Sequence, residues 1–235
     1  RKVCGFPLSG SLPVTYPFVL AFPLHMEMLV SDAFPFPLLG LVHVKNEITQ
    51  YRAIGNQEVL DIECSLVGPR PANKGLEFDI HTRVHVAGKL VWECVSAMLR
   101  RMPESGDKKK DSTDKKAEEA APQNVVSWPI SESTGRRYAA ASGDRNPIHL
   151  YALTAKMFGF PRAIAHGMWT KAHCLAELDS QLPKGPYKVS VSFKLPVFLP
   201  SNVQFQYSAA EGHIEFQVKD SKGEKPHMSG SIEAL

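Results

Sequence analysis

Cysteine is scarce in this sequence of 235 residues, and long apolar runs are missing. The four cysteines lie far apart, with neither a CxxC pair nor a Cys/His spacing typical of zinc sites. They do not suggest a disulfide scaffold, so we expect reduced core thiols and a cytoplasmic protein. The best candidate for a membrane span, residues 17–29, is interrupted by Pro23, His25 and Glu27. Because the chain begins at Arg1 rather than Met, we leave open whether a segment such as a signal peptide precedes it.

The chain also has little excess charge of either sign. Its 27 basic and 24 acidic residues give a formal net charge of +3. An excess of this size does not indicate nucleic-acid binding, but it is compatible with an anionic small ligand. The composition, 43% hydrophobic and 22% charged, is ordinary for a globular protein and suits one large domain or two of about 110 residues.

One segment differs from the rest of the chain in composition. Residues 103–122, PESGDKKKDSTDKKAEEAAP, contain no large apolar side chain. Such a segment cannot bury enough surface to offset the entropy of ordering it, so the composition predicts a charged flexible linker. A lysine-rich phosphate-binding patch is the alternative, which the interspersed acidic residues disfavour. The linker divides the chain into an N-terminal half, residues 1–102, and a C-terminal half, residues 123–235.

The two halves have similar hydrophobic patterns. Each contains an apolar segment followed by alternating apolar residues, which are typical of paired strands joined by turns. The strand patterns lie at residues 42–64 and 75–99 in the first half, and at 189–209 and 212–235 in the second. This internal repeat predicts an α+β protein with two antiparallel sheets, each wrapping one helix.

The expected helices of the two halves differ. Residues 163–178, AIAHGMWTKAHCLAEL, have small side chains that let a sheet approach closely, and few long polar ones, so we expect a buried central helix. The matching N-terminal segment contains Pro17, Pro23, Pro35 and Pro37. Because proline costs about 3 kcal/mol inside a helix, we expect a broken or shortened helix there, with a gap able to hold a long apolar guest.

The segment SGDRNPIH, residues 142–149, carries the main chemical signal. Its Gly, Asp, Asn and Pro residues are typical of turns and helix caps. One interpretation of Asp144 and Asn146 is therefore that they only form a turn and a cap. A cap does not need an imidazole, however, and His149 follows at once. A carboxylate and a histidine can share the transfer of a proton near neutral pH, so the segment also predicts an acid–base site.

A second signal is AIAHGMWT, residues 163–170, at the start of the expected buried helix. The N–H groups of a first helical turn can stabilise an oxyanion, and Gly167 leaves room for a substrate. The alternative is that Gly167 only permits close packing of the helix against a sheet. His166 is either a further base or ligand or, more simply, a structural histidine, and we count His166 and Met168 as candidate substrate contacts.

The two segments together resemble the (R)-specific enoyl-CoA hydratases, or MaoC-like dehydratases. The family signature is an aromatic residue, a small residue and then Gly-Asp-x-Asn-Pro-aliphatic-His, with AHGM at residues 165–168 as a second landmark and FKLPVFLP at 193–200 as the following strand. The residues that match the signature are Tyr138, Ser142, Gly143, Asp144, Asn146, Pro147, Ile148 and His149. The N-terminal half lacks it and resembles the non-catalytic half of double hot-dog members, which accommodates the acyl chain.

The resemblance implies a double hot-dog fold and a hydro-lyase reaction. Asp144 and His149 would hold one water, which adds to C3 of a trans-2-enoyl thioester while C2 receives a proton. The N–H of Gly167 would stabilise the charge on the thioester oxygen, and Asn146 would orient the pair or the water. The product would be the (R)-3-hydroxyacyl thioester, in a reversible reaction that needs no metal and no cofactor other than the carrier.

The carrier, CoA or acyl carrier protein, is anionic. Arg162, Lys188 and Lys194 are therefore candidates for contacts with the CoA phosphates, although each could be a plain surface charge. The aromatic and Met-rich N-terminal run could line an acyl tunnel or form ordinary core. This run comprises Phe18, Phe22, Met26, Met28, Phe34 and Phe36.

Four functions on this fold remain in competition. They are an acyl-CoA hydratase, a dehydratase acting on acyl carrier protein, a thioesterase and a non-catalytic acyl-binding module. The spacing of Asp144, Asn146 and His149 disfavours a thioesterase, and the presence of both Asp144 and His149 disfavours a pure binding module. A basic surface patch would favour the carrier protein over CoA. A homodimer of double hot-dog units is also compatible with the sequence.

Overall fold

The strands of the protein form one continuous antiparallel sheet. The computed structural model describes residues 1–102 and 122–235, so the predicted linker lies almost entirely outside the described residues. The sheet has nine strands in the order β2-β3-β4-β1-β6-β9-β8-β7-β5. Their bounds are β1 Leu41–Gln50, β2 Asp61–Ala72, β3 Gly75–Val86, β4 Lys89–Arg101, β5 Asn124–Ile130, β6 Tyr187–Phe193, β7 Ser201–Ala210, β8 His213–Asp220 and β9 Pro226–Ala234.

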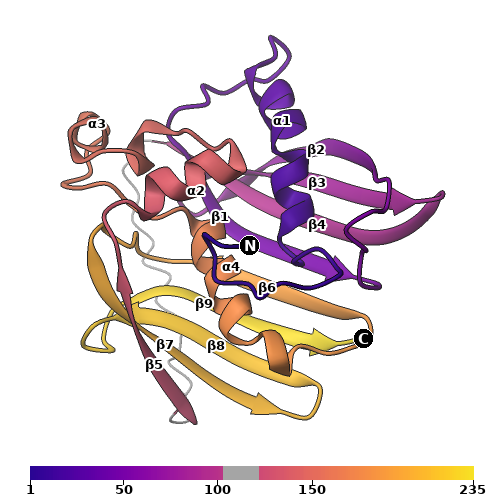
Figure 1. Ribbon diagram of the computed structural model, residues 1–235. Helices are drawn as coiled ribbons and strands as arrows, with labels where there is room; N and C mark the ends of the chain where they lie inside the picture. Colours follow the sequence, from indigo (N-terminus) through magenta and orange to yellow (C-terminus); the bar gives the residue numbers. More distant parts are fainter. Residues whose placement is uncertain (103–121) are drawn as a thin grey trace.

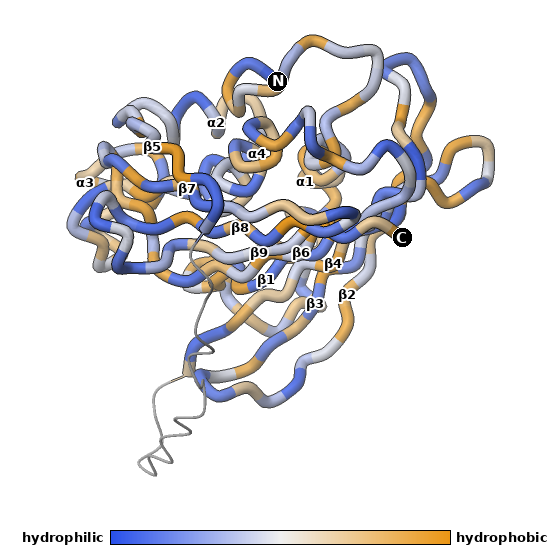
Figure 2. Tube along the Cα trace, turned by 90° about the horizontal axis from the view of Figure 1, so that it is seen from below, coloured by the Kyte–Doolittle hydropathy of each residue, from blue (hydrophilic) through white to orange (hydrophobic). Residues whose placement is uncertain are grey.

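The helices lie on one face of this sheet (Figure 1), and Figure 2 shows α1, α2 and α4 above the strands when the molecule is turned. Within the described residues, no helix is both long and apolar enough to cross a lipid bilayer. The helical elements are α1 Tyr16–Val30, α2 Thr134–Ser142, the 3-10 turn η1 Pro147–His149, α3 Ala152–Met157, α4 Gly167–Glu177 and the 3-10 turn η2 Asp179–Gln181.

The predicted α+β arrangement is observed, but the two predicted sheets are joined. Strands β1–β4 belong to the N-terminal half and β5–β9 to the C-terminal half, and they meet where β1 pairs with β6. In this pair Asn46 lies opposite Val191, and Ile48 lies opposite Val189. We call the β1–β6 pair the seam. It makes one sheet out of the two halves, so α1 and α4 share one layer.

The N-terminal helix is longer than the sequence predicted. Helix α1 continues through Pro23 over 15 residues, whereas α4 has 11, so the expectation of a broken or shortened helix was wrong. The buried side chains of α1 recur every four residues, at Pro17, Ala21, His25 and Leu29, and form one stripe against the sheet. Pro23 is exposed on the other side. The packing of the buried stripe offsets the local cost of the proline.

The aromatic N-terminal run separates into two groups. Met28, Phe34 and Phe36 pack with Leu29, Phe78 and Ile80 in a small core cluster beside β3. This packing supports the interpretation of the three residues as ordinary core. Phe18 instead packs against the main core, which includes α4 and the inner side chains of the C-terminal strands. Phe18, near the start of α1, therefore packs beside the C-terminal half.

Candidate active site

The loop between α2 and η1 is built from local hydrogen bonds. Gly143 ends α2 with a φ of 79°, a left-handed conformation that glycine adopts at low cost. The Asp144 N–H donates to Ser142 Oγ at 3.2 Å, and the Asn146 N–H donates to Asp144 Oδ1 at 3.2 Å. Asn146 Oδ1 in turn accepts from the Ile148 N–H at 3.3 Å, which caps η1. Asn146 thus shapes the loop that carries Asp144 and His149.

His149 is held by the backbone on two sides. Its Nδ1 lies 2.8 Å from the Ile164 carbonyl oxygen. Because a carbonyl only accepts, Nδ1 carries the proton and Nε2 is the unprotonated nitrogen. On the other side, a Cβ on Gly135 of α2 would overlap the His149 carbonyl oxygen. The sequence prediction missed Gly135, whose only signal was a glycine inside a short helix.

His166 lies against both predicted acid–base residues. Its ring stacks on the His149 ring with centroids 3.7 Å apart and an angle of 28° between the planes. Its Nε2 donates to the Asp144 carbonyl oxygen at 3.1 Å and lies 3.9 Å from Asp144 Oδ2. Its Nδ1 is buried and has no hydrogen-bond partner among the described residues. The hydrogen bonds of His166 are therefore only partly satisfied, because Nε2 is paired and Nδ1 is not.

Burial keeps both imidazoles neutral. It lowers the pKa of His149 below the usual value of 6.5, although the Asp144 carboxylate and the hydrogen bond to Ile164 oppose the shift. Burial and the neighbouring His149 lower the pKa of His166 well below 6.5. Asp144 is less enclosed, with its side chain 31% exposed. At neutral pH the site thus combines two uncharged imidazoles with one partly solvated carboxyl group, a set that can accept and return a proton.

The same three residues form a candidate metal-ligand group. One ligand atom from each of Asp144, His149 and His166 lies within 4.8 Å of the others. Imidazole nitrogens bind a metal in the plane of the ring. Because the two rings are stacked at 3.7 Å and nearly parallel, a metal bound in plane by one ring would lie well out of the plane of the other.

Gly167 is the first residue of α4. The N–H groups of this first turn have no carbonyl acceptor inside the helix and carry the positive end of the helix dipole. A Cβ on Gly167 would lie 2.8 Å from the Phe193 ring of β6. Close packing therefore requires a glycine here, as one of the two sequence interpretations proposed. A glycine at the first position of a helix is also compatible with the oxyanion interpretation, because it has no side chain to fill the space beside its N–H.

The N-terminal half contributes aromatic side chains next to this site. A Cβ on Gly143 would lie 3.7 Å from the Phe22 ring of α1. The Phe18 ring stacks on His43 of β1 at 6.2 Å, and His43 lies 4.9 Å from the Phe193 ring. Phe18 and Phe22 are thus the members of the predicted acyl-lining run that reach the surroundings of Asp144 and Gly167.

The remaining candidates for substrate contacts lie in different environments. Met168 is 5% exposed and belongs to the main core. Arg162 and Lys194 are exposed; Arg162 donates to the Pro200 carbonyl oxygen at 3.1 Å and lies over the Phe198 ring. Lys188 does not fit the prediction, because it points to the sheet face opposite the helices and pairs with Glu47 at 3.6 Å. Its neighbours Tyr187 and Val189 are buried, and adjacent strand residues point to opposite faces.

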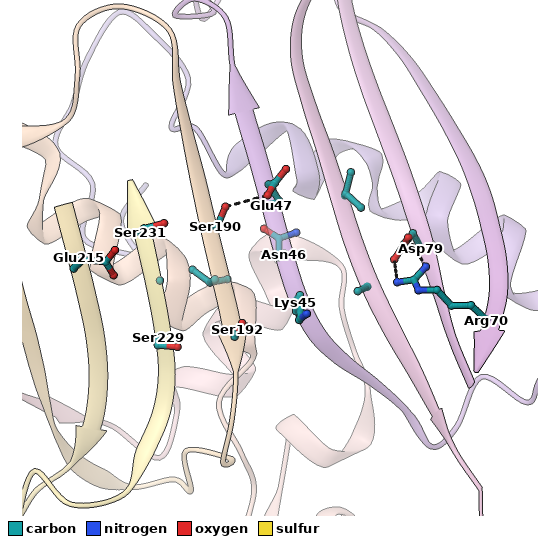
Figure 3. Close-up of a pocket in the computed structure, with 14 residues that line it drawn as sticks. Lys45, Asn46, Glu47, Arg70, Asp79, Ser190, Ser192, Glu215, Ser229 and Ser231 are labelled. Atoms are coloured by element: carbon teal, nitrogen blue, oxygen red, sulfur yellow. Dashed lines mark hydrogen bonds and ion pairs between the residues drawn. The ribbon is translucent and has the colours of Figure 1, made fainter. Parts of the chain in front are cut away.

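A polar hollow of about 500 Å³ lies on that outer face across the seam (Figure 3). Four of its lining residues are serines on β6 and β9: Ser190, Ser192, Ser229 and Ser231. Most of its charged side chains are engaged, since Arg70 pairs with Asp79 at 2.6 Å and Glu47 accepts from Ser190 at 3.1 Å, while Lys45 is exposed. The hollow lacks the unpaired acid–base groups of the His149 loop, so we place the candidate active site at that loop.

Comparisons with known proteins agree with this architecture. The family described as MaoC like domain matches residues 114–230. A 3-hydroxyacyl-thioester dehydratase X of Mycobacterium tuberculosis is 33% identical over 234 residues, covering 99% of this chain and 82% of that protein. An (R)-specific enoyl-CoA hydratase of Aeromonas caviae is 44% identical over 69 residues, or 28% of this chain and 52% of that protein. The crystal structure of HtdX from Mycobacterium tuberculosis matches with a TM-score of 0.85 at 32% identity, covering 100% of this chain and 92% of that one.

A continuous sheet with the helices on one face is the architecture of the hot-dog proteins, and the named relatives are dehydratases and hydratases, which are hydro-lyases. The similarity to the dehydratase of Mycobacterium tuberculosis extends over nearly the whole chain. The protein belongs to the MaoC-like dehydratase family. The predicted α+β hot-dog fold and the hydratase/dehydratase class are thereby confirmed.

Proposed function

We propose that the protein catalyses the reversible hydration of trans-2-enoyl-CoA to (R)-3-hydroxyacyl-CoA. The observation that carries this proposal is the convergence of Asp144, His149 and His166 within 4.8 Å, directly before the first turn of α4. A relative over part of the chain is named an (R)-specific enoyl-CoA hydratase, and one over nearly the whole chain a 3-hydroxyacyl-thioester dehydratase. The two names describe one equilibrium approached from opposite sides.

In the proposed mechanism, Asp144 and His149 hold one water molecule between the carboxylate and the unprotonated Nε2. His149 accepts a proton as the water oxygen forms a bond to C3 of the enoyl thioester. The pair returns a proton to C2, so that H and OH of one water add across the double bond and the enzyme is unchanged. The neutral state that burial imposes on His149 supports the role of base. Dehydration follows the same steps in reverse.

The thioester oxygen gains negative charge as water adds to C3. The N–H of Gly167, at the positive end of α4, would stabilise this charge. Removing one such donor from an oxyanion site typically costs on the order of 10²–10³ in rate. His166 would keep the Asp144 loop next to this donor through its 3.1 Å bond to the Asp144 carbonyl oxygen.

We assign different roles to the two halves. Residues 123–235 would supply the catalytic groups, and residues 1–102 would accommodate the acyl chain. The contact of Phe22 with Gly143, and the sequence of contacts from Phe18 through His43 to Phe193, support an acyl path between α1 and α4. Arg162 and Lys194, both exposed, are the remaining candidates for the CoA phosphates.

A carrier protein in place of CoA is a second candidate, favoured by the segment that follows His149. Leu153 and Met157 of α3 are 76% and 78% exposed, and Lys156 between them is exposed as well. An exposed apolar pair beside a cation is typical of protein contacts. The same acyl group should be assayed on CoA and on acyl carrier protein, with Met157→Asp as the variant. A selective loss with the carrier protein would assign the partner, whereas equal rates in variant and wild type would favour CoA.

The proposed function is tested by following the loss of the conjugated thioester absorbance with enoyl-CoAs of short, medium and long chain. Chiral analysis of the product then reports the configuration at C3. Formation of the (R)-3-hydroxyacyl thioester would support the proposal. An (S) product, or hydrolysis of the thioester in place of hydration, would contradict it.

A further inference from the structure

Lys171 is a fully buried cation that the reaction described above does not use. Within the described part of the chain it is the only lysine or arginine classed as buried, with 0% exposure. It lies on α4 four residues after Gly167, so the two residues share one face of the helix. The Lys171 side chain points to the sheet, where its Nζ reaches Asn46 of β1 and Val189 of β6.

The Lys171 ammonium group is fully hydrogen bonded at the seam. Its Nζ donates to Asn46 Oδ1 at 2.6 Å, to the Asn46 carbonyl oxygen at 3.3 Å and to the Val189 carbonyl oxygen at 3.2 Å. The Asn46 side-chain amide donates in turn to Cys94 Sγ and Ser96 Oγ, both at 3.0 Å. One lysine thus ties α4 to β1 and β6 directly and to β4 through Asn46. Figure 3 shows the strand position of Asn46 between Lys45 and Glu47, beside β6.

Two contacts fix α4 along β6. Lys171 reaches Val189, and four residues away on each element Gly167 lies against Phe193. The helix therefore runs antiparallel to the strand, with Lys171 as the polar anchor and Gly167 as the close contact. A shift of the helix along the strand would break the ammonium contacts and displace the Gly167 N–H together.

Stability alone does not account for a lysine at this position. No carboxylate lies within hydrogen-bonding distance of Nζ among the described residues, so the desolvated cation is compensated only by carbonyl and amide oxygens. Replacing a buried charge by an apolar side chain of similar volume is often neutral or stabilising. A buried charge on the helix that begins at the candidate oxyanion donor suggests a role in the reaction.

We propose that Lys171 is a positioning residue, which holds the first turn of α4 on the β1–β6 seam and adds positive potential behind the Gly167 N–H. This inference rests on the proposed function, because it assigns Lys171 to the stabilisation of the thioester oxyanion. Lys171 does not touch the substrate; it acts through the position and the electrostatic environment of Gly167.

The surroundings of Lys171 give this role a pH signature. Burial lowers the pKa of Lys171 to about 7, while Cys94 of β4 and Glu47 of β1 oppose the shift. His43, also on β1, is the other titratable group that senses the charge of Lys171. The positive potential should therefore be lost as pH rises through neutrality, and the rate should fall on the alkaline side.

Two variants and a control test the inference by steady-state kinetics across pH. Lys171→Met should lower kcat about 10- to 100-fold with KM changed less than about twofold, because a displaced donor affects the transition state most. Asn46→Asp places a carboxylate against the ammonium and should move the alkaline limb of kcat to higher pH. Lys89→Met, at the exposed β3–β4 turn, should behave as wild type. Wild-type kcat in Lys171→Met, or an unmoved limb in Asn46→Asp, would overturn the inference.

A second measurement does not depend on turnover. The backbone amide resonance of Gly167 should shift with a midpoint near pH 7 in the wild type. This titration should be lost in Lys171→Met. Thermal unfolding then checks that the variant is folded. An unchanged Gly167 signal in the variant would overturn the inference even if no enoyl thioester is turned over. A wild type without hydratase activity whose Gly167 signal still follows Lys171 would instead contradict the proposed function and leave the coupling of Lys171 to Gly167 established.

Discussion

The imidazole rings of His149 and His166 stack with their centroids 3.7 Å apart, and each donates one N–H to a backbone oxygen. His149 donates to Ile164 and His166 donates to Asp144. The donor nitrogens are therefore fixed, and each ring retains one unprotonated nitrogen. The stack links the segment before α4 to the loop that carries Asp144, so movement of either ring alters the acid–base pair.

His166→Phe should separate stacking from hydrogen bonding. A phenyl ring can still stack on His149, but it leaves the Asp144 carbonyl oxygen unpaired, at a cost of about 1–3 kcal/mol. We expect kcat/KM to fall by roughly tenfold or more, because the loop that carries Asp144 loses its contact with residue 166 and the acid–base pair is displaced, while the protein stays folded. Tyr138→Phe, which keeps the ring 4.9 Å from His166, is the matched control. Equal kinetics for both variants would show that the Asp144 contact does not matter.

The buried histidines should make the protein sensitive to acid. Burial lowers the pKa of His25 to about 4 and that of His43 to about 3, and it also lowers the pKa values of His149 and His166. Below pH 6.5 the unfolded chain takes up protons that the folded protein does not. The free energy of unfolding should therefore be highest above pH 6.5 and fall as the pH is lowered toward about 3.

This dependence can be assigned by denaturant unfolding at several pH values. His43→Phe removes a buried ring nitrogen that has no partner among the described residues and should gain more stability at pH 5 than at pH 8. His213→Gln, at a position whose side chain is 42% exposed, should leave the profile unchanged. A His43→Phe profile parallel to that of wild type would refute the assignment to His43.

Gly167→Ala should impair both stability and turnover. The added methyl group would lie 2.8 Å from the Phe193 ring, and overpacking of this kind typically costs about 1–3 kcal/mol. The backbone N–H is retained, so the loss arises from displacement of α4. Adding Phe193→Leu should recover part of the stability and part of kcat. The measurements are thermal unfolding and kcat of the single and double variants. If neither stability nor kcat recovers in the double variant, the clash with Phe193 is not the cause of the loss.

Phe22→Ala should change the selectivity for chain length. Phe22 lies beside Gly143 at the boundary of α1 and the catalytic loop. If the acyl chain passes between α1 and α4, a smaller side chain should raise kcat/KM for long enoyl-CoAs relative to short ones. Phe36→Leu, in the separate core cluster, should leave the selectivity profile in place. An unaltered profile in Phe22→Ala would place the acyl chain elsewhere.

The parts of the site that follow local rules could be predicted from sequence. Gly143 ends a helix and Asn146 caps a turn because their own backbone geometry and short side chains require it. The contact of His166 with the Asp144 carbonyl joins separate segments, and no pattern along the chain specifies it. Lys171 carried a weak signal, as a lone long cation within the small-residue body of a buried helix, but its partner Asn46 lies in the other half.

One prediction failed and one site assignment is disfavoured by the structure, each for an identifiable physical reason. Helix propensity at Pro23 was overridden by the packing of Ala21, His25 and Leu29 against the sheet. Lys188 was assigned by charge alone, although the alternation of β6 places it with Ser190 on the outer face. In the first case tertiary contacts outweighed a local preference. In the second, the alternation of residues along the strand already indicated the sheet face on which Lys188 lies.

The central claim is that Asp144 and His149 activate one water for addition to an enoyl thioester. We would measure hydration of enoyl-CoA by wild type and Asp144→Asn at pH 7.5, with folding checked by circular dichroism. The asparagine can still accept from the Asn146 N–H that Asp144 Oδ1 binds at 3.2 Å, so the loop should keep its shape. The account predicts a loss of about 10²–10⁴ in kcat with an intact fold. A folded variant that retains wild-type turnover would contradict it.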